Sequence, residues 1–215
     1  MTRHVLYILG AGGHGKVVGD CARSEGRWAE IIYLDDRWPI LDACEAWKVV
    51  GAGLTLIDEP LQAAEFSSNR SAFVAIGHAE TRLRLLRRLK QKNIKIASVK
   101  HPAAVVSLGT IYDFGTIFVA GSVVNIGTRL GMGCIVNTGA TVDHDCILGD
   151  GVHVCPGANL GGNVQVGEGS WIGIGSSVRQ GIKIGAGVTI GAGAAVVTDV
   201  ADGMTMVGVP ARPIR

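Results

Sequence analysis

A period of six residues runs through the second half of this 215-residue chain. A period of six fits neither an α-helix, which repeats every 3.6 residues, nor a single strand, which repeats every two. It fits short strands that are joined by tight turns and stacked as a parallel β-solenoid. The sixteen apolar positions of the repeat are Val106, Tyr112, Phe118, Val124, Leu130, Val136, Val142, Leu148, Val154, Leu160, Val166, Ile172, Val178, Ile184, Ile190 and Val196.

Two other positions of the repeat support this fold. The residue two before each apolar position is small or aliphatic, so the two side chains share one face of a short strand. The residue after the apolar position is often glycine, as at Gly131, Gly149 and Gly167. Because glycine enters strained turns at little cost, we expect these glycines to form the turns. The alternative, a glycine-rich β-domain of another kind, does not account for sixteen hexads in one phase.

The first half of the chain carries a different pattern. A buried strand is predicted at residues 5–9, followed by a glycine loop at 10–15, a helix, and a second strand at 31–34 that ends in Asp35. Strand, glycine loop, helix, strand and acid form the order of a nucleotide-binding βαβ unit. We therefore expect a Rossmann-like α/β domain.

The glycine loop has two interpretations. Glycines allow a diphosphate to approach the backbone at a helix N-terminus, where amides and the helix dipole favour anions. A tight turn without a ligand is the alternative, and the spacing of Asp35 favours the ligand. His14 lies inside the loop, which is unusual for a dinucleotide site and suggests that another polar group of the ligand is met there.

The boundary between the two halves is predicted at His101-Pro102, which gives domains at 1–100 and 101–215. Other elements expected before it are a turn at 51–53, a short helix at 60–66, strands at 72–76 and 94–99, and an amphipathic helix with an exposed basic face within 82–95.

Composition excludes several classes of function. A net charge of +2 and the absence of a dense basic run argue against a nucleic-acid surface. No apolar run reaches the roughly 18 residues of a membrane span, and from the residues after Met1 we expect no signal peptide. The five cysteines are odd in number and form no CxxC pair, so a reducing cytoplasm is expected.

His144 is the first candidate for catalysis, because it lies outside the core phase between Asp143 and Asp145. A carboxylate beside an imidazole fixes its tautomer and stabilises its protonated form, which suits a general base. A solvated histidine among acids at a surface corner is the alternative.

A metal site is the other possibility at these histidines. His144 with Cys146, and His153 with Cys155, have the spacing of ligand pairs. Cys146, however, falls in the inward phase of the repeat and should face the core. We expect no metal.

The hexad pattern resembles the hexapeptide repeat of left-handed β-helix acyltransferases, in which three hexads make one coil. Over the whole chain the sequence resembles the PglD/NeuD-type nucleotide-sugar N-acetyltransferases. The matching motifs are Gly10-Ala11-Gly12-Gly13-His14-Gly15, Leu34-Asp35-Asp36, Ala75-Ile76-Gly77, Asn137-Thr138, Val142-Asp143-His144-Asp145-Cys146 and Gly208-Val209-Pro210-Ala211. The resemblance implies a Rossmann-like domain followed by a left-handed parallel β-helix, here of about five coils.

The resemblance also implies roles for individual residues. His144 matches the catalytic base, and Asp145 stands where the family has an acid that is often glutamate. Nucleotide-sugar contacts fall on Gly12, Gly13, His14, Asp35, Asp36 and Gly77. Acetyl-CoA contacts fall on Asn137, His153, Ile174 and Ala192.

The implied reaction is direct transfer of acetyl from acetyl-CoA to the C4 amine of a UDP-linked 4-amino-4,6-dideoxy sugar. A related line acts on GDP-perosamine, so the nucleotide stays open. A homotrimer with active sites between subunits is implied, and outward apolar residues such as Ile126 and Ile135 would need its cover. The alternatives are an O-acetyltransferase for a sugar or sialic acid hydroxyl, and a non-catalytic β-solenoid binding module.

Overall fold

The computed structural model describes residues 4–52 and 69–214. The chain divides into two compact units, residues 1–101 and 102–215. Two expected features, the helix at 60–66 and the end of the turn at 51–53, lie outside the described residues.

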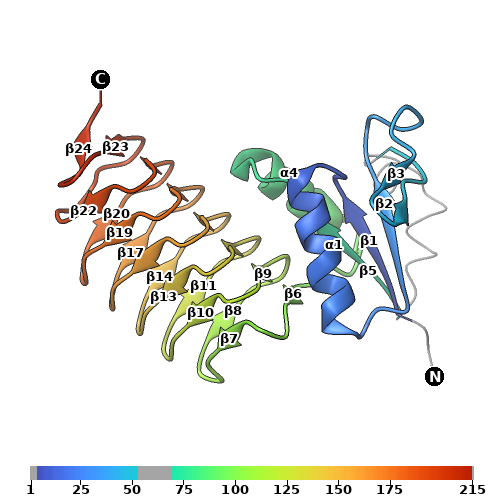
Figure 1. Ribbon diagram of the computed structural model, residues 1–215, viewed down its shortest axis with the longest axis horizontal. Helices are drawn as coiled ribbons and strands as arrows, with labels where there is room; N and C mark the ends of the chain where they lie inside the picture. Colours follow the sequence, from blue (N-terminus) through green and yellow to red (C-terminus); the bar gives the residue numbers. More distant parts are fainter. Residues whose placement is uncertain (1–3, 53–68, 215) are drawn as a thin grey trace. The chain divides into compact units, whose positions relative to one another are not determined.

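The first unit is built on a parallel sheet (Figure 1). Its strands run in the order β2 (Glu30–Leu34), β1 (Val5–Leu9) and β5 (Arg70–Val74). The predicted βαβ unit is confirmed, since helix α1 (Gly13–Glu25) joins β1 to β2 and ends at Gly26 in the left-handed conformation. Helix α4 (Ala79–Gln91) follows β5.

Smaller elements complete this unit. Strands β3 (Ala43–Cys44) and β4 (Trp47–Lys48) form a hairpin. Strand β6 (Val99–Lys100) lies at the end of the unit in the sequence. The strand expected over 94–99 is wrong in extent: Ile96 forms one isolated bridge, with Ala72. The bridge has two hydrogen bonds, from the Ala72 amide to the Lys95 carbonyl and from the Ala97 amide to the Ala72 carbonyl. Both involve Ala72 alone of the β5 residues, so the pairing does not extend into a strand.

The second unit is the predicted parallel β-solenoid, with strands of two or three residues on three faces (Figure 1). The first face holds β7 (Val105–Val106), β10 (Val123–Val124), β13 (Thr141–Val142), β16 (Asn159–Leu160), β19 (Ser177–Val178) and β22 (Ala195–Val196). The second face holds β8 (Ile111–Tyr112), β11 (Arg129–Leu130), β14 (Ile147–Leu148), β17 (Gln165–Val166) and β20 (Lys183–Ile184). The third face holds β9 (Ile117–Phe118), β12 (Ile135–Val136), β15 (His153–Val154), β18 (Trp171–Ile172), β21 (Thr189–Ile190) and β23 (Thr205–Val207), with β24 (Arg212–Pro213) antiparallel to β23.

One coil is three hexads, because strand partners lie eighteen residues apart, as Val123 and Thr141 do. The solenoid has about six turns rather than five. In the last turn Val200 bridges Ile184 and Met206 pairs with Ile190, so the partners are sixteen residues apart. The coil is two residues shorter, and the sequence leaves its six-residue phase after Val196.

The core is formed by the two positions that the repeat predicted to face inward, except in the first coil, where Tyr112 is 43% exposed and Val106 only partly buried. Phe118, Val136 and Val154 are fully buried, as are the small residues Cys134 and Ala140. Short strands of this kind gain their stability from the apolar faces that successive coils cover.

The turn role expected for the glycines after each apolar position is wrong. A Cβ added to Gly149 would lie 2.7 Å from the Glu168 amide nitrogen, and one added to Gly161 would lie 2.8 Å from that of Gln180. These glycines let the next coil approach. The left-handed turns come three residues after the apolar position, as at Gly151 and Gly157.

Candidate active site

A cavity of about 360 Å³ lies in the first unit at the carboxyl ends of β1, β2 and β5. Ligands of parallel α/β sheets bind at this edge. The cavity brings together all the residues for which the sequence predicted nucleotide-sugar contacts: Gly12, Gly13, His14, Asp35, Asp36 and Gly77. Because α1 begins at Gly13, its first-turn amides point towards the cavity and favour an anion there.

Asp35 holds the glycine loop in place. Its carboxylate accepts hydrogen bonds from the Ala11 amide at 2.8 Å and from two nitrogens of the Arg37 guanidinium, Nε at 2.7 Å and Nη2 at 2.9 Å. The hydrogen bond from Arg37 is the main reason that the pKa of Asp35 is lowered. Sequence analysis missed Arg37, which lines the cavity and is oriented by this pair.

His14 is mostly buried in the cavity wall. Burial, and secondly the positive charge of Arg82, lower its pKa to about 4. Arg82 is itself fully buried, and its Nη1 donates to the carbonyl oxygens of Ile76 and Gly77, each at 2.7 Å. The expected exposed basic face of this helix is therefore wrong at Arg82. The sequence did not predict that Arg82 is buried, because an arginine in an amphipathic helix is expected on the exposed face.

His144 and Asp145 lie at the corner of the solenoid that follows β13. Nδ1 of His144 lies 2.9 Å from Oδ2 of Asp145, and both side chains are more than half exposed. The hydrogen bond to Asp145 and the charge of Asp143 raise the pKa of His144. With Nδ1 donating to the carboxylate, Nε2 is the ring nitrogen left to accept a proton.

Asp143 fixes the backbone beside this pair. Its Oδ1 accepts the His144 amide at 2.8 Å and the Asn125 side-chain amide at 2.7 Å. Both donors lower the pKa of Asp143, with Asn125 the larger cause. Asp143 therefore remains charged next to the imidazole.

Asp145 has an unusual backbone for a side-chain-bearing residue, with φ of 58°. The equivalent corner of the neighbouring coils carries Gly127 and Asn163, also at positive φ. Asp and Asn tolerate this conformation better than most residues, at a cost of roughly 1–2 kcal/mol. In this conformation the carboxylate lies 2.9 Å from the His144 imidazole.

Asn137 and His153 form a second pair. His153 lies in β15 on the third face, and Asn137 lies at the corner that follows β12. The Asn137 side-chain nitrogen lies 3.0 Å from Nε2 of His153, and His153 is nearly buried. Trp171, which sequence analysis missed, packs edge-on against the His153 ring at 4.3 Å between centroids. Ile174 and Ala192 are exposed further along the same corner.

The two groups of solenoid residues lie on different edges. His144 and Asp145 follow a strand of the first face, whereas Asn137, Ile174 and Ala192 follow strands of the third face. Asn137 and His153 are brought together within one chain, but the His144–Asp145 pair is not joined to them.

The described residues contain no group of three or more His, Cys, Asp or Glu side chains that could hold a metal ion. Cys146 lies in the solenoid core, as its phase predicted. Burial raises the pKa of the Cys155 thiol to about 12 and also raises that of Cys146. Neither thiol is therefore activated as a nucleophile.

Comparisons with known proteins agree with both units. Residues 5–89 match the PglD N-terminal domain, and residues 163–197 match the bacterial transferase hexapeptide repeat. The acetyltransferase domain of PglB from Neisseria gonorrhoeae FA1090 is 41% identical with a TM-score of 0.92, covering 99% of this chain and 100% of that one. PerB from Caulobacter crescentus, solved with CoA and GDP-perosamine, is 36% identical with a TM-score of 0.87, covering 98% and 97%.

A curated relative adds a third similarity. The UDP-N-acetylbacillosamine N-acetyltransferase of Bacillus subtilis (strain 168) is 36% identical over 122 residues, which is 54% of this chain. The match spans about half of that relative, 51% of its length.

The fold is thus that of the hexapeptide-repeat acyltransferases, a left-handed parallel β-helix preceded by an α/β domain. Within this class, the chain belongs to the PglD-type family of nucleotide-sugar N-acetyltransferases.

Proposed function

We propose that this protein transfers acetyl from acetyl-CoA to the C4 amine of a nucleotide-linked 4-amino-4,6-dideoxy sugar. The observation that carries the proposal is the hydrogen bond between His144 Nδ1 and Asp145 Oδ2, which leaves Nε2 as the accepting nitrogen. The names of the relatives support the reaction class: one acts on a UDP-sugar and another was solved with CoA and GDP-perosamine.

In the proposed reaction the C4 amine attacks the thioester carbonyl carbon. His144 Nε2 accepts the proton that the amine loses, and Asp145 stabilises the imidazolium. As the tetrahedral intermediate collapses, the C–S bond breaks, and the CoA sulfur takes the proton from the His144 imidazolium and leaves as the thiol, which returns His144 to its neutral form. The raised pKa of His144 makes it a stronger base than a free imidazole.

The nucleotide sugar is assigned to the cavity of the first unit. Backbone amides at the start of α1 suit a diphosphate, and the buried His14 is neutral at pH 7 because its pKa is about 4. A neutral imidazole offers one donor and one acceptor. We assign Gly12, Gly13, Asp36 and Gly77 to contacts with this ligand, and Asp35 to the loop that surrounds it.

Acetyl-CoA is assigned to the corner that follows the third face. Asn137 and His153 would lie near the thioester, with Ile174 and Ala192 along the remainder of the cofactor. A structure of the Neisseria PglB acetyltransferase domain, 40% identical, was solved in complex with acetyl coenzyme A.

The base and the acetyl-CoA residues lie on two edges, so we propose that neighbouring copies complete each site in a homotrimer. Exposed apolar side chains surround the His144 corner: Ile126 is 64% exposed, and Ile147 lies on the next face at 49%. The expectation that Ile135 faces outward and needs cover is wrong, because Ile135 is 1% exposed within one chain.

No helix within residues 4–52 and 69–214 has the length and apolar character to cross a membrane. The five cysteines are free, and all are buried. We propose the cytoplasm as the site of action, since free thiols persist in a reducing compartment.

The test is thiol release from acetyl-CoA, measured against a panel of UDP- and GDP-linked 4-amino sugars and the matched 4-hydroxy sugars. We expect turnover with a 4-amino sugar, and favour the UDP series. Turnover with a hydroxy sugar alone would identify an O-acetyltransferase instead. Binding without any thiol release would identify a non-catalytic solenoid and contradict the proposal.

A further inference from the structure

Gly162 lies in the coil that follows His144, eighteen residues along the chain and so at the same position of the repeat. A Cβ added to Gly162 would have three nearest neighbours, and all three are atoms of the His144 ring. The distances are 2.5 Å to Nε2, 2.6 Å to Cε1 and 3.0 Å to Cδ2. Ordinary carbon contacts are about 3.5–4.0 Å, so any side chain at 162 would displace the imidazole.

The backbone does not itself require glycine at this position. Gly162 is outside the left-handed region, unlike Gly157, and its three nearest neighbours include no backbone atom, unlike those of Gly161. The same position of the coil is occupied by Ile126 two coils earlier and by Gln180 one coil later. The backbone thus accepts a side chain at this corner, and at 162 the imidazole takes its place.

Asp145 also has a glycine beside its side chain, in the coil that precedes it. A Cβ at Gly127, in the preceding coil, would overlap Oδ1 of Asp145. Gly127 has φ of 78°, so its backbone conformation favours glycine in any case. Gly162 is therefore the position at which the imidazole alone explains the missing side chain.

We propose that Gly162 is a positioning residue of the acetyl transfer, which keeps the His144 ring at hydrogen-bond distance from Asp145 with Nε2 facing the substrate. This inference rests on the proposed role of His144 as the base. A methyl group at 162 would move the ring by about 1 Å, because 2.5 Å must become at least an ordinary contact. Such a shift would lengthen the 2.9 Å bond to Asp145 beyond the usual range.

The test is Gly162→Ala, studied by steady-state kinetics and by NMR titration of the His144 ring. Misplacement of a reacting group by 1 Å can cost about 100-fold in rate, so we expect kcat to fall roughly 10- to 100-fold with little change in KM for the nucleotide sugar. The pKa of His144 should fall towards its ordinary value as the bond to Asp145 is lost. A protein affected only in its fold would not show this change in pKa.

Two controls separate the cause. Gln180→Ala changes the same corner one coil later and should leave both kcat and the His144 pKa unchanged. In a double-mutant cycle, Gly162→Ala should cost nothing more once His144→Ala has removed the ring. The double variant also shows whether alanine at 162 allows the coil to fold.

Unchanged kcat and pKa in Gly162→Ala would overturn the inference. So would a loss of rate that persists at full size in the His144→Ala background, because the methyl group would then act without the imidazole. If the pKa falls but neither Gly162→Ala nor His144→Ala alters turnover, Gly162 positions the ring as stated and the role of His144 as the base is wrong.

Discussion

The His144 imidazole combines exposure with tight placement. Its side chain is more than half exposed, yet Asp143 accepts the backbone amide of His144 and Asp145 accepts a hydrogen bond from its ring. These hydrogen bonds orient the ring more than they stabilise the fold, because exposed ion pairs contribute little to stability.

His144→Ala should lower kcat/KM by about 10²–10⁴, the usual contribution of a general base. Melting should barely change, because the side chain is exposed and off the core phase. Asp145→Asn should cost less, since this residue only supports the ring. Steady-state kinetics with melting curves measure both. Near-normal turnover of His144→Ala would show that the base lies elsewhere, and unfolding would show a structural histidine.

The pH dependence of the rate should follow His144. A base must be unprotonated to act, so kcat/KM should fall as pH drops through the pKa of His144, which lies above its ordinary value of 6.5. Asp145→Asn removes the main cause of the raised pKa and should move this acid limb to lower pH. The substrate amine titrates equally for both enzymes, so their difference reports His144. Superimposable profiles would count against the assignment.

The unit of strand β1, the glycine loop and helix α1 positions a histidine that folding keeps neutral. Burial, and secondly the positive charge of Arg82 on α4, lower the pKa of His14 from 6.5 to about 4. The unfolded chain therefore binds a proton more readily than the folded protein does. Stability from this source is complete above pH 6.5 and is lost as pH falls towards 4.

His14→Gln should remove this part of the acid sensitivity. The wild-type protein should lose on the order of 3 kcal/mol in free energy of unfolding between pH 6.5 and 4 through His14, whereas the variant should lose less over the same range. Urea unfolding at several pH values measures the difference, and carboxylates elsewhere contribute equally to both proteins. Parallel curves would show that His14 is accessible enough to be protonated in the folded state.

Local sequence patterns predict much of the fold, and the features that they do not predict depend on contacts between distant parts of the chain. The hexads predicted the strands and inward residues because burial repeats with the coil. The buried Arg82 was not predictable, since its carbonyl partners are set by how α4 packs on the end of β5. The reason for Gly162 depends on the side chain eighteen residues earlier, which a single hexad does not reveal.

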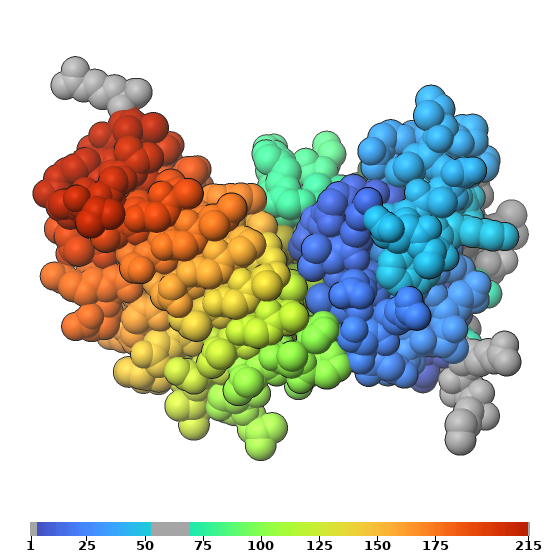
Figure 2. All heavy atoms as spheres, viewed as in Figure 1, coloured from blue at the N-terminus to red at the C-terminus, as the bar shows by residue number. Residues whose placement is uncertain are grey.

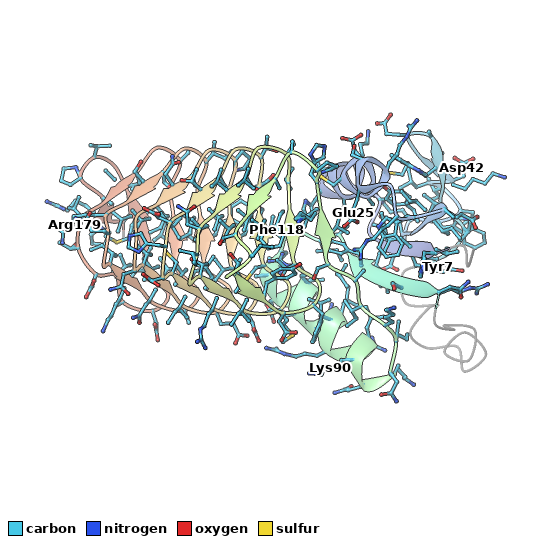
Figure 3. All side chains as sticks on the ribbon, turned by 90° about the horizontal axis from the view of Figure 1, so that it is seen from below. Tyr7, Glu25, Asp42, Lys90, Phe118 and Arg179 are labelled. Atoms are coloured by element: carbon cyan, nitrogen blue, oxygen red, sulfur yellow. The ribbon has the colours of Figure 1, made fainter. Side chains whose placement is uncertain are left out.

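The two units are each continuous in the chain, as the colours of Figure 2 show, and the site residues are divided between them. Figure 3 shows side chains projecting outward all along the solenoid, including Arg179 in its later coils. Within the solenoid, the proposed base and the proposed acetyl-CoA residues lie on two edges, so the proposed site needs both. That requirement is the basis of the proposed trimer.

Mixing of two inactive variants tests this arrangement. His144→Ala supplies Asn137 and His153, and the Asn137→Ala/His153→Ala variant supplies His144. If each site is shared, subunit exchange at equal amounts should restore about a quarter of the wild-type sites in a cyclic trimer, because one in four interfaces joins two intact halves. Thiol release after mixing is the measurement. No recovery in a mixture shown by light scattering to contain mixed trimers, or a stable monomer at micromolar concentration, would contradict a shared site.

Because each coil of the solenoid has eighteen residues, the number of coils sets the distance between residues on the same edge. Inserting eighteen residues would add one complete turn and leave every later side chain on its own edge, whereas inserting six would carry them all to the next face. A whole extra turn between His153 and Ala192 would lengthen their separation by about 4.8 Å. Acetyl-CoA has a fixed length, so the proposed contacts at both residues require the present number of coils between them.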